Sequence, residues 1–283
     1  MTEVAVVGTG RMGGAMAGRL CGAGHRVSVY NRTADKARAI AGATAVDTPA
    51  EAARRAEVVV VSLADDDAVR QAYGDLVDGL RPGAIVLETS TIHPETVRAL
   101  TAGVEARGAT LIDAPVSGSV PLVERGELTI LAGGDAEALD RARPVLAAFA
   151  SRVFHLGGPG TGATMKLAVN AVVFALNQAV AEALVLAEKA GVDRARAYEV
   201  FTASAIAAPF VAYKRDAFVD PEHAPVAFAL DLVAKDFGLI DAVARGVDAR
   251  MDQLGVNRRV VAEALAAGYG GRDLSAVADL LRR

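Results

Sequence analysis

Short apolar runs recur along the first half of the chain. A run of four to eight apolar residues between turn signals is typical of a strand that is buried on both faces of a sheet. Such runs, and one that alternates apolar and polar positions, lie at residues 4–7, 25–30, 58–63, 84–88, 110–112 and 128–132. Helical segments, among them 12–23 and 33–41, separate them. This alternation predicts βαβ units and a doubly wound, largely parallel sheet of the Rossmann type.

The pattern changes after the glycine-rich segment 157–160. No convincing strand follows, and residues 165–190 read as one long apolar helix that ends at Gly191. Further helices are expected at residues 193–202, 228–245, 257–267 and 274–281. The sequence therefore predicts an α/β domain over residues 1–160, a glycine hinge, and an all-helical domain over residues 161–283.

Length and composition agree with two globular domains. The chain has 283 residues, of which 52% are hydrophobic and 23% are charged, and a domain averages roughly 150 residues. The net charge of −4 argues against a protein that binds nucleic acid by general phosphate attraction. The single cysteine, Cys21, excludes an intrachain disulfide, and the four histidines lack metal-ligand spacing. We expect no metal site and a reducing, cytoplasmic setting.

The sequence gives no indication of a membrane protein. The N-terminal residues lack the basic region and cleavage site of a signal peptide. The longest apolar stretch, near 168–186, is interrupted by four polar residues: Asn170, Asn177, Gln178 and Glu182. We therefore expect a core helix there rather than a membrane span.

A glycine motif connects the first strand to the first helix. Gly8, Gly10 and Gly13, with Arg11 and Met12 between the last two, form GxGxxG. In dinucleotide-binding folds the first glycine permits the turn, the second lets the backbone approach a pyrophosphate, and the third lets helix and strand pack. The alternative is a glycine turn that serves packing alone.

The end of the second strand indicates which nicotinamide dinucleotide binds. An Asp or Glu about 20 residues after the glycines would bind the ribose 2′-hydroxyl of NAD, but the residues there are Asn31, Arg32 and Thr33. An arginine fork suits the 2′-phosphate of NADP. We therefore expect NADP rather than NAD, the alternative being an ordinary solvated arginine.

Three further groups could carry chemistry. The small residues Ser117, Gly118 and Ser119 could present hydroxyl and N–H groups to an anion, or could form an ordinary turn. Lys166 and Asn170 lie four residues apart, on one face of the long apolar helix. They need polar partners or a cavity, although a snorkelling lysine and a structural asparagine would fit too. Lys235-Asp236 could be a surface stripe.

Together, in this order and spacing, GxGxMG, NRT, DAPVSGS, GxGxxxKxxxN and KD resemble the β-hydroxyacid dehydrogenase family. This family belongs to the 6-phosphogluconate dehydrogenase superfamily. It includes 3-hydroxyisobutyrate dehydrogenases and glyoxylate/succinic semialdehyde reductases, and imine reductases are relatives. The resemblance covers essentially the whole chain. It implies an NADP(H)-dependent oxidoreductase that interconverts a small hydroxy acid and its semialdehyde or oxo acid, and that forms a homodimer or homotetramer through the helical domain.

The resemblance also implies residue roles. Lys166 would exchange the proton with the carbonyl oxygen, and an ammonium beside a developing alkoxide is suited to that step. Asn170 would orient Lys166 or the substrate, and Ser117, Gly118 and Ser119 would hold the substrate carboxylate. The remaining matches are on the cofactor side: Leu63, Ala64 and Thr91 would line the nicotinamide and ribose, Lys235 would reach the cofactor, and Asp236 would support it.

The chain departs from the family pattern at two positions, and two rival functions stay open. Ser119 replaces a glycine, which could narrow the anion pocket, and Ala64 replaces a proline. The first rival is an imine reductase, but those relatives usually carry Asp or Tyr where this chain has Lys166. The second is a nucleotide-binding module without turnover, which the Lys166–Asn170 pair disfavours.

Overall fold

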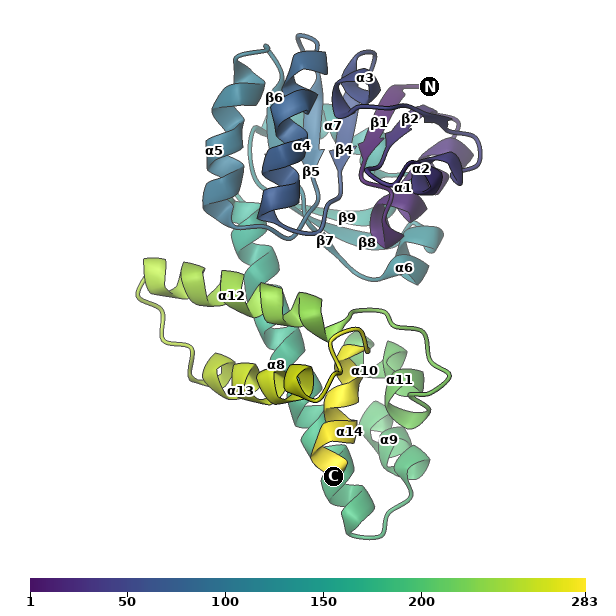
Figure 1. Cartoon of the computed structure of the whole chain (residues 1–283), viewed down its shortest axis with the longest axis vertical. Coiled ribbons are helices and arrows are strands. Elements are labelled where there is room, and N and C mark those ends of the chain that lie inside the picture. The colour runs from purple at the N-terminus through teal and green to yellow at the C-terminus, as the bar shows by residue number, and fades with distance from the viewer. The chain divides into compact units, whose positions relative to one another are not determined.

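A computed structural model describes all 283 residues of the chain. The chain consists of two compact units, Met1–Lys166 and Leu167–Arg283, whose elements are labelled in Figure 1. The division between these units lies inside a helix, and the domain boundary expected between residues 160 and 161 stays a prediction.

The first unit is built on a parallel sheet of six strands, in the order β3-β2-β1-β4-β5-β6. The strands are β1 (Glu3–Val7), β2 (Arg26–Tyr30), β3 (Thr44–Ala45), β4 (Val58–Val61), β5 (Ile85–Glu88) and β6 (Thr110–Asp113). All five pairings are parallel. The doubly wound α/β prediction is therefore confirmed, while the two-residue strand β3 was not expected from the sequence.

Helices cover both faces of this sheet. They are α1 (Arg11–Gly22), α2 (Ala34–Arg38), α3 (Pro49–Ala53), α4 (Asp66–Gly79), α5 (Pro94–Glu105), α6 (Val120–Arg125) and α7 (Ala136–Leu146). Along β1, Val4 and Val6 join one hydrophobic core and Ala5 and Val7 join the other. Successive strand side chains point to opposite faces, so the run 4–7 is apolar throughout because both faces are buried.

The structure also contains a second, smaller sheet that was not expected from the sequence. The strands β7 (Val116–Ser117), β8 (Leu128–Ala132) and β9 (Ala150–His155) form a separate sheet, in which β7 is antiparallel to β8. The sequence did not indicate β9, because most of its side chains are exposed and it shows no apolar alternation. The segment 116–117, expected in a turn, is a short strand.

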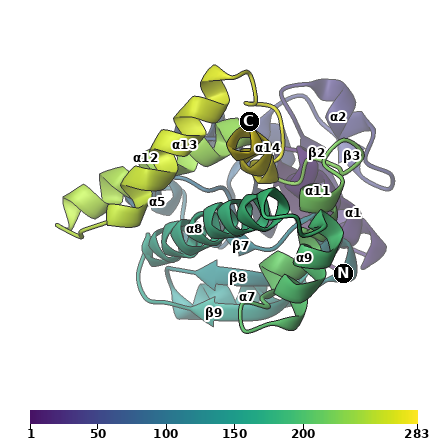
Figure 2. The ribbon, with the colours of Figure 1, turned by 90° about the horizontal axis from the view of Figure 1, so that it is seen from below.

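The second unit is all helical, as the sequence predicts. Its elements are α8 (Thr161–Lys189), α9 (Arg194–Ala203), α10 (Pro209–Tyr213), α11 (Arg215–Val219), α12 (Leu230–Gly246), α13 (Asp252–Ala266), a 3-10 turn (Leu274–Ala276) and α14 (Val277–Arg282). Figure 2 shows α12 and α13 on one flank of α8 and α9 on the other. The short helices α10 and α11 were not expected.

By length and composition alone, α8 could cross a membrane. Its buried side chains, including Leu167, Phe174, Val180 and Leu184, belong to the core of the helical unit. Its buried Asn177 donates a hydrogen bond to the carbonyl oxygen of Leu274 at 3.0 Å. These contacts are those of a helix at the centre of a folded unit, where polar side chains have protein partners.

Candidate functional site

The glycine loop after β1 is tight at two positions and open at a third. Gly8 has a φ of +96°, and a Cβ there would lie 2.2 Å from the carbonyl oxygen of Ser62. A Cβ at Gly13 would lie 1.9 Å from the carbonyl oxygen of Gly8, whereas one at Gly10 would meet nothing within 4 Å. The loop thus has the form that lets a pyrophosphate reach the N-terminus of α1, so these residues fit a dinucleotide.

Asn31 holds this loop to the end of β2. Its Oδ1 accepts a hydrogen bond from the Thr9 N–H at 3.0 Å, and its Nδ2 donates to the Thr33 carbonyl at 3.0 Å. The neighbouring Arg32 is exposed. The nearest acid along the chain, Asp35, is exposed and pairs with Arg38 at 3.2 Å. This strand end therefore presents a cation and no carboxylate of its own.

The ends of β4 and β5 are joined by side-chain hydrogen bonds. The Leu63 N–H donates to Ser90 Oγ at 2.8 Å, and the Ser90 N–H donates to Glu88 Oε1 at 2.8 Å. The three predicted cofactor residues follow the carboxyl ends of these adjacent strands: Leu63 and Ala64 come after β4, and Thr91 comes after β5. Leu63 and Thr91 are half-buried, and Ala64 is exposed. The sequence did not single out Glu88 or Ser90.

Ser117 is the last residue of β7, and Gly118 and Ser119 connect this strand to α6. Ser117 pairs with Thr129 of β8. Gly118 has a φ of +141°, and a Cβ there would lie 2.6 Å from Leu128 Cδ2, so a glycine is required. Ser119 occupies the N-cap position of α6, but its side chain makes no capping hydrogen bond. The three residues form one short polar segment, as expected.

Asp113, at the end of β6, fixes the start of α8. Its Oδ1 accepts from the Gly160 N–H at 2.9 Å and its Oδ2 accepts from the Ala163 N–H at 2.8 Å. Burial raises the pKa of this carboxyl group, and the hydrogen bonds from the helix oppose the shift. The first turn of α8 is thus tied to the first unit, although the sequence suggested a glycine hinge there. Lys166 follows Ala163 by three residues and is half-buried.

Asn170 and Asp236 form a buried polar pair in the helical unit. Asn170 Nδ2 on α8 donates to Asp236 Oδ2 on α12 at 2.7 Å, and both side chains are buried. Lys235 Nζ lies 3.0 Å from Asp236 Oδ1. The family resemblance implies only a supporting role for Asp236. In the structure it is the residue that contacts both Asn170 and Lys235.

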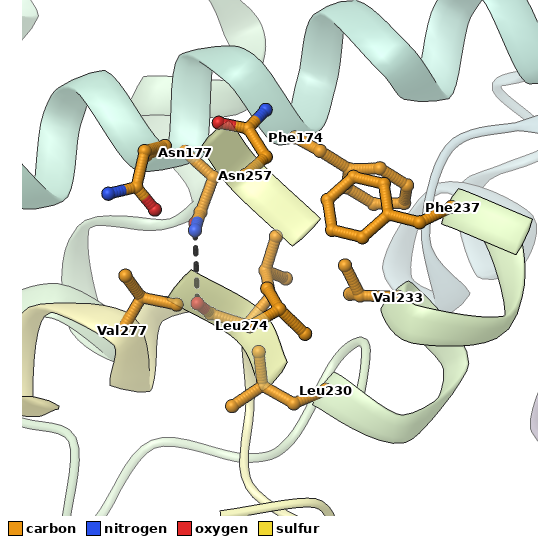
Figure 3. A pocket seen from close by; sticks show the side chains of 10 residues that line it. Phe174, Asn177, Leu230, Val233, Phe237, Asn257, Leu274 and Val277 are labelled. Atoms are coloured by element: carbon orange, nitrogen blue, oxygen red, sulfur yellow. Dashed lines mark hydrogen bonds between the residues drawn. The ribbon is translucent and has the colours of Figure 1, made fainter. Parts of the chain in front are cut away.

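A second buried polar pair in the helical unit joins Lys214 to Asp273. Lys214 is buried, and its Nζ lies 2.7 Å from both carboxylate oxygens of Asp273. Figure 3 shows a small cavity lined by Phe174, Asn177 and Phe237. It has room for about one water molecule, far below the roughly 300–1,000 Å³ of a ligand pocket. No group of three His, Cys, Asp or Glu side chains could hold a metal ion.

Family models match both halves of the chain. Residues 3–157 match the NAD binding domain of 6-phosphogluconate dehydrogenase. Residues 160–281 match a domain described as the NAD-binding domain of NADP-dependent 3-hydroxyisobutyrate dehydrogenase.

Several proteins are similar to this chain over its length. The 3-sulfolactaldehyde reductase of Escherichia coli K12 is 35% identical, covering 100% of this chain and 96% of the relative. The NAD-dependent L-serine dehydrogenase of Pseudomonas aeruginosa is 32% identical, covering 99% and 98%. The 3-hydroxyisobutyrate dehydrogenase of Mycobacterium tuberculosis, solved with L-serine, is 31% identical and has a TM-score of 0.87, with both chains fully covered. A Pseudomonas imine reductase, 21% identical with a TM-score of 0.69, shares the fold.

Proposed function

The chain belongs to the β-hydroxyacid dehydrogenase family, and we propose that it is an NADP(H)-dependent enzyme of this family that acts on a small anionic hydroxy acid or its carbonyl counterpart. The observation that carries the proposal is the glycine loop. Backbone atoms leave no room for a Cβ at Gly8 or Gly13, whereas the space beside Gly10 is free. Membership of this family implies a nicotinamide cofactor, and the proposed roles of individual residues rest on this chain's own side chains.

The preference for NADP rests on Arg32. Its exposed guanidinium at the end of β2 can form charge-assisted hydrogen bonds with a 2′-phosphate. Asp35 is engaged with Arg38, so it does not take the place of the acid that would hold the ribose of NAD. A family member with NAD specificity exists, so this preference depends on the chain's own residues.

Lys166 is proposed as the general acid and base. NADPH, when bound, supplies the hydride that reduces the substrate carbonyl. The Lys166 ammonium stabilises the alkoxide that develops on the carbonyl oxygen and protonates it; in the oxidation, the neutral amine accepts the proton from the hydroxyl group. Asn170 lies one helical turn further along α8, where its hydrogen bond to Asp236 fixes the amide.

Ser117, Gly118 and Ser119 are proposed to bind the acid group of the substrate. Hydroxyl and backbone N–H groups of such a polar turn can donate to an anion. Ser119 has no capping bond to α6, so its hydroxyl is available for this role. An imine reductase remains the second candidate because it shares the fold, but Lys166 favours carbonyl reduction.

We also propose a homodimer or homotetramer formed through the helical unit, in the cytoplasm. The side chains of Met165, Val172, Ala179 and Leu186 are exposed at seven-residue intervals along α8, with Val172 and Leu186 exposed to 68% and 72%. Residues spaced by seven lie nearly on one helix face, and an apolar stripe of this kind favours burial against a second subunit.

The experiment that tests the function is an assay of dinucleotide oxidation and reduction. The purified protein is given a panel of small semialdehydes, 2- and 3-oxo acids, their hydroxy acids and cyclic imines, each with NADPH and with NADH. Turnover of a carbonyl–hydroxy acid pair with NADP(H) is expected. Turnover of imines alone would favour the second candidate, and no turnover with an intact dinucleotide complex would favour a binding module.

A further inference from the structure

Glu88 is a buried carboxyl group that the proposed reaction does not use. It lies at the end of β5 with 1% of its surface exposed. Burial raises its pKa to about 7. Burying a carboxyl group costs folding free energy unless hydrogen bonds compensate. The contacts of Glu88 therefore indicate its role.

These contacts lead from Glu88 to the loop after β4. Glu88 Oε1 accepts from the Ser90 N–H, and Ser90 Oγ accepts from the Leu63 N–H, each at 2.8 Å. Because the Ser90 oxygen accepts from Leu63, the hydroxyl proton is left to be donated elsewhere. The contact with Ser90 also lowers the pKa of the Glu88 carboxyl group, against the larger effect of burial.

The Leu63 segment in turn borders the glycine loop. A Cβ at Gly8 would lie 2.2 Å from the Ser62 carbonyl oxygen and 2.8 Å from Leu63 Cδ2. A Cβ at Gly13 would lie 3.1 Å from Ser62 Cβ. The position of residues 62–63 therefore sets the space beside the loop that cradles the dinucleotide.

We propose that Glu88 is a positioning residue for the dinucleotide site: it holds Ser90 through the Ser90 N–H, and the Ser90 Oγ in turn orients the Leu63 peptide beside the glycine loop. This inference rests on the proposed dinucleotide-dependent function.

Two other titratable groups face Glu88. The phenol of Tyr73, on α4, lies beside it, and burial raises the pKa of that phenol well above its usual range. Asp113 is its register partner on β6.

The test separates charge from packing. Glu88→Gln keeps the volume and loses the charge, whereas Glu88→Asp loses a methylene and keeps a carboxylate, which can accept from the N–H two residues on. We expect Glu88→Gln and Ser90→Ala each to raise the KM for NADPH about 5–30-fold, which corresponds to about 1–2 kcal/mol, within the cost of leaving one buried polar group without its partner. The KM for the hydroxy acid should change less than about twofold, and Glu88→Asp should stay near wild type. In the double variant the two effects should not add, because they act through one contact.

Thr89→Val is the matched control. Thr89 is buried next to Ser90 and donates to the Val61 carbonyl oxygen at 2.6 Å, so its variant loses a buried bond between the same strand ends but not the Leu63 contact. It should leave the KM for NADPH unchanged. The inference is overturned if wild type binds NADPH and Glu88→Gln binds it equally well, or if Glu88→Asp and Thr89→Val weaken binding as much as Glu88→Gln. A wild type that binds neither NADPH nor NADH in a fluorescence titration overturns the proposed function instead.

Discussion

Asn170 on α8 and Asp236 on α12 are joined by a hydrogen bond of 2.7 Å between buried side chains. The two residues lie 66 positions apart in the chain. The bond holds the amide of Asn170 in one orientation, and the Lys235 ammonium lies 3.0 Å from the other carboxylate oxygen of Asp236. Two candidate site residues are thus positioned by one carboxylate.

Replacing Asp236 by Ala should therefore lower both stability and activity. Asn170 and Lys235 would both lose the carboxylate that they share. Asn170 is buried, and a buried polar group without a partner lowers the free energy of unfolding by about 1–3 kcal/mol. We expect kcat/KM for the hydroxy acid to fall at least about tenfold, with a lower Tm. Asn177→Ala is the control, since Asn177 is a buried asparagine on the same helix that bonds to Leu274. It should lower Tm and leave kcat/KM near wild type; an equal loss of activity would mean that only stability is affected.

Replacing Lys166 by Ala should remove the proton transfer. Turnover on the best carbonyl substrate should fall about 10²–10⁴-fold, the range for a lost general acid. The Kd for NADPH, measured by fluorescence, should be unchanged because Arg32 and the glycine loop are intact. Lys166→Arg should restore little activity, since a guanidinium does not release its proton. Lys189→Ala, at the exposed end of α8, should behave as wild type. Near-normal turnover of Lys166→Ala would assign the proton to another donor.

Replacing Arg32 by Ala should raise the KM for NADPH and leave that for NADH almost unchanged. The loss of a charge-assisted phosphate contact costs roughly 1.5–3 kcal/mol, or about 10–100-fold in affinity. Arg38→Ala removes a nearby exposed arginine that pairs with Asp35. This control should change neither the KM for NADPH nor the KM for NADH appreciably. A wild-type enzyme that prefers NADH would contradict this prediction.

The stability of the protein should depend on the ionisation of Glu88. Its pKa is raised from 4.5 to about 7, so the folded state holds this proton more tightly than the unfolded state does. The stabilisation is fully present below pH 4.5 and is lost as the pH rises through about 7, which amounts to about 3 kcal/mol. Relative to Glu88→Gln, which has no charge to bury, the Tm of wild type should fall by on the order of 5–10 °C between pH 5 and pH 8. A constant difference in Tm would contradict the raised pKa.

Replacing Leu186 by Glu should dissociate the proposed oligomer. Leu186 is 72% exposed within a single chain, so the charge should cost the folded monomer little. In the oligomer it would have to be buried unpaired. Light scattering at micromolar concentration should show at least a dimer for wild type and a monomer for this variant. Val247→Glu, at another exposed apolar side chain of the helical unit, should keep the wild-type mass. A monomeric wild type would refute the oligomer.

The sequence alone determined the elements whose signals are local. The residues of β1, β4 and β5 are apolar at nearly every position because both faces of the sheet are buried. The glycine motif, α8 and the helical character of the second unit were also readable, because periodicity and glycine spacing belong to neighbouring residues. The position of Lys166 one turn before Asn170 follows from the helix period alone.

The tertiary structure decided what depends on contacts between distant residues. The second sheet pairs β8 with β9, whose exposed side chains carry no alternating pattern. Asp113 caps a helix that begins about 50 residues later, and Glu88 reaches Leu63 through Ser90. A hydrogen bond between groups far apart in the chain leaves no periodic trace in the sequence, because its partners are brought together only when the strands align and the helices pack.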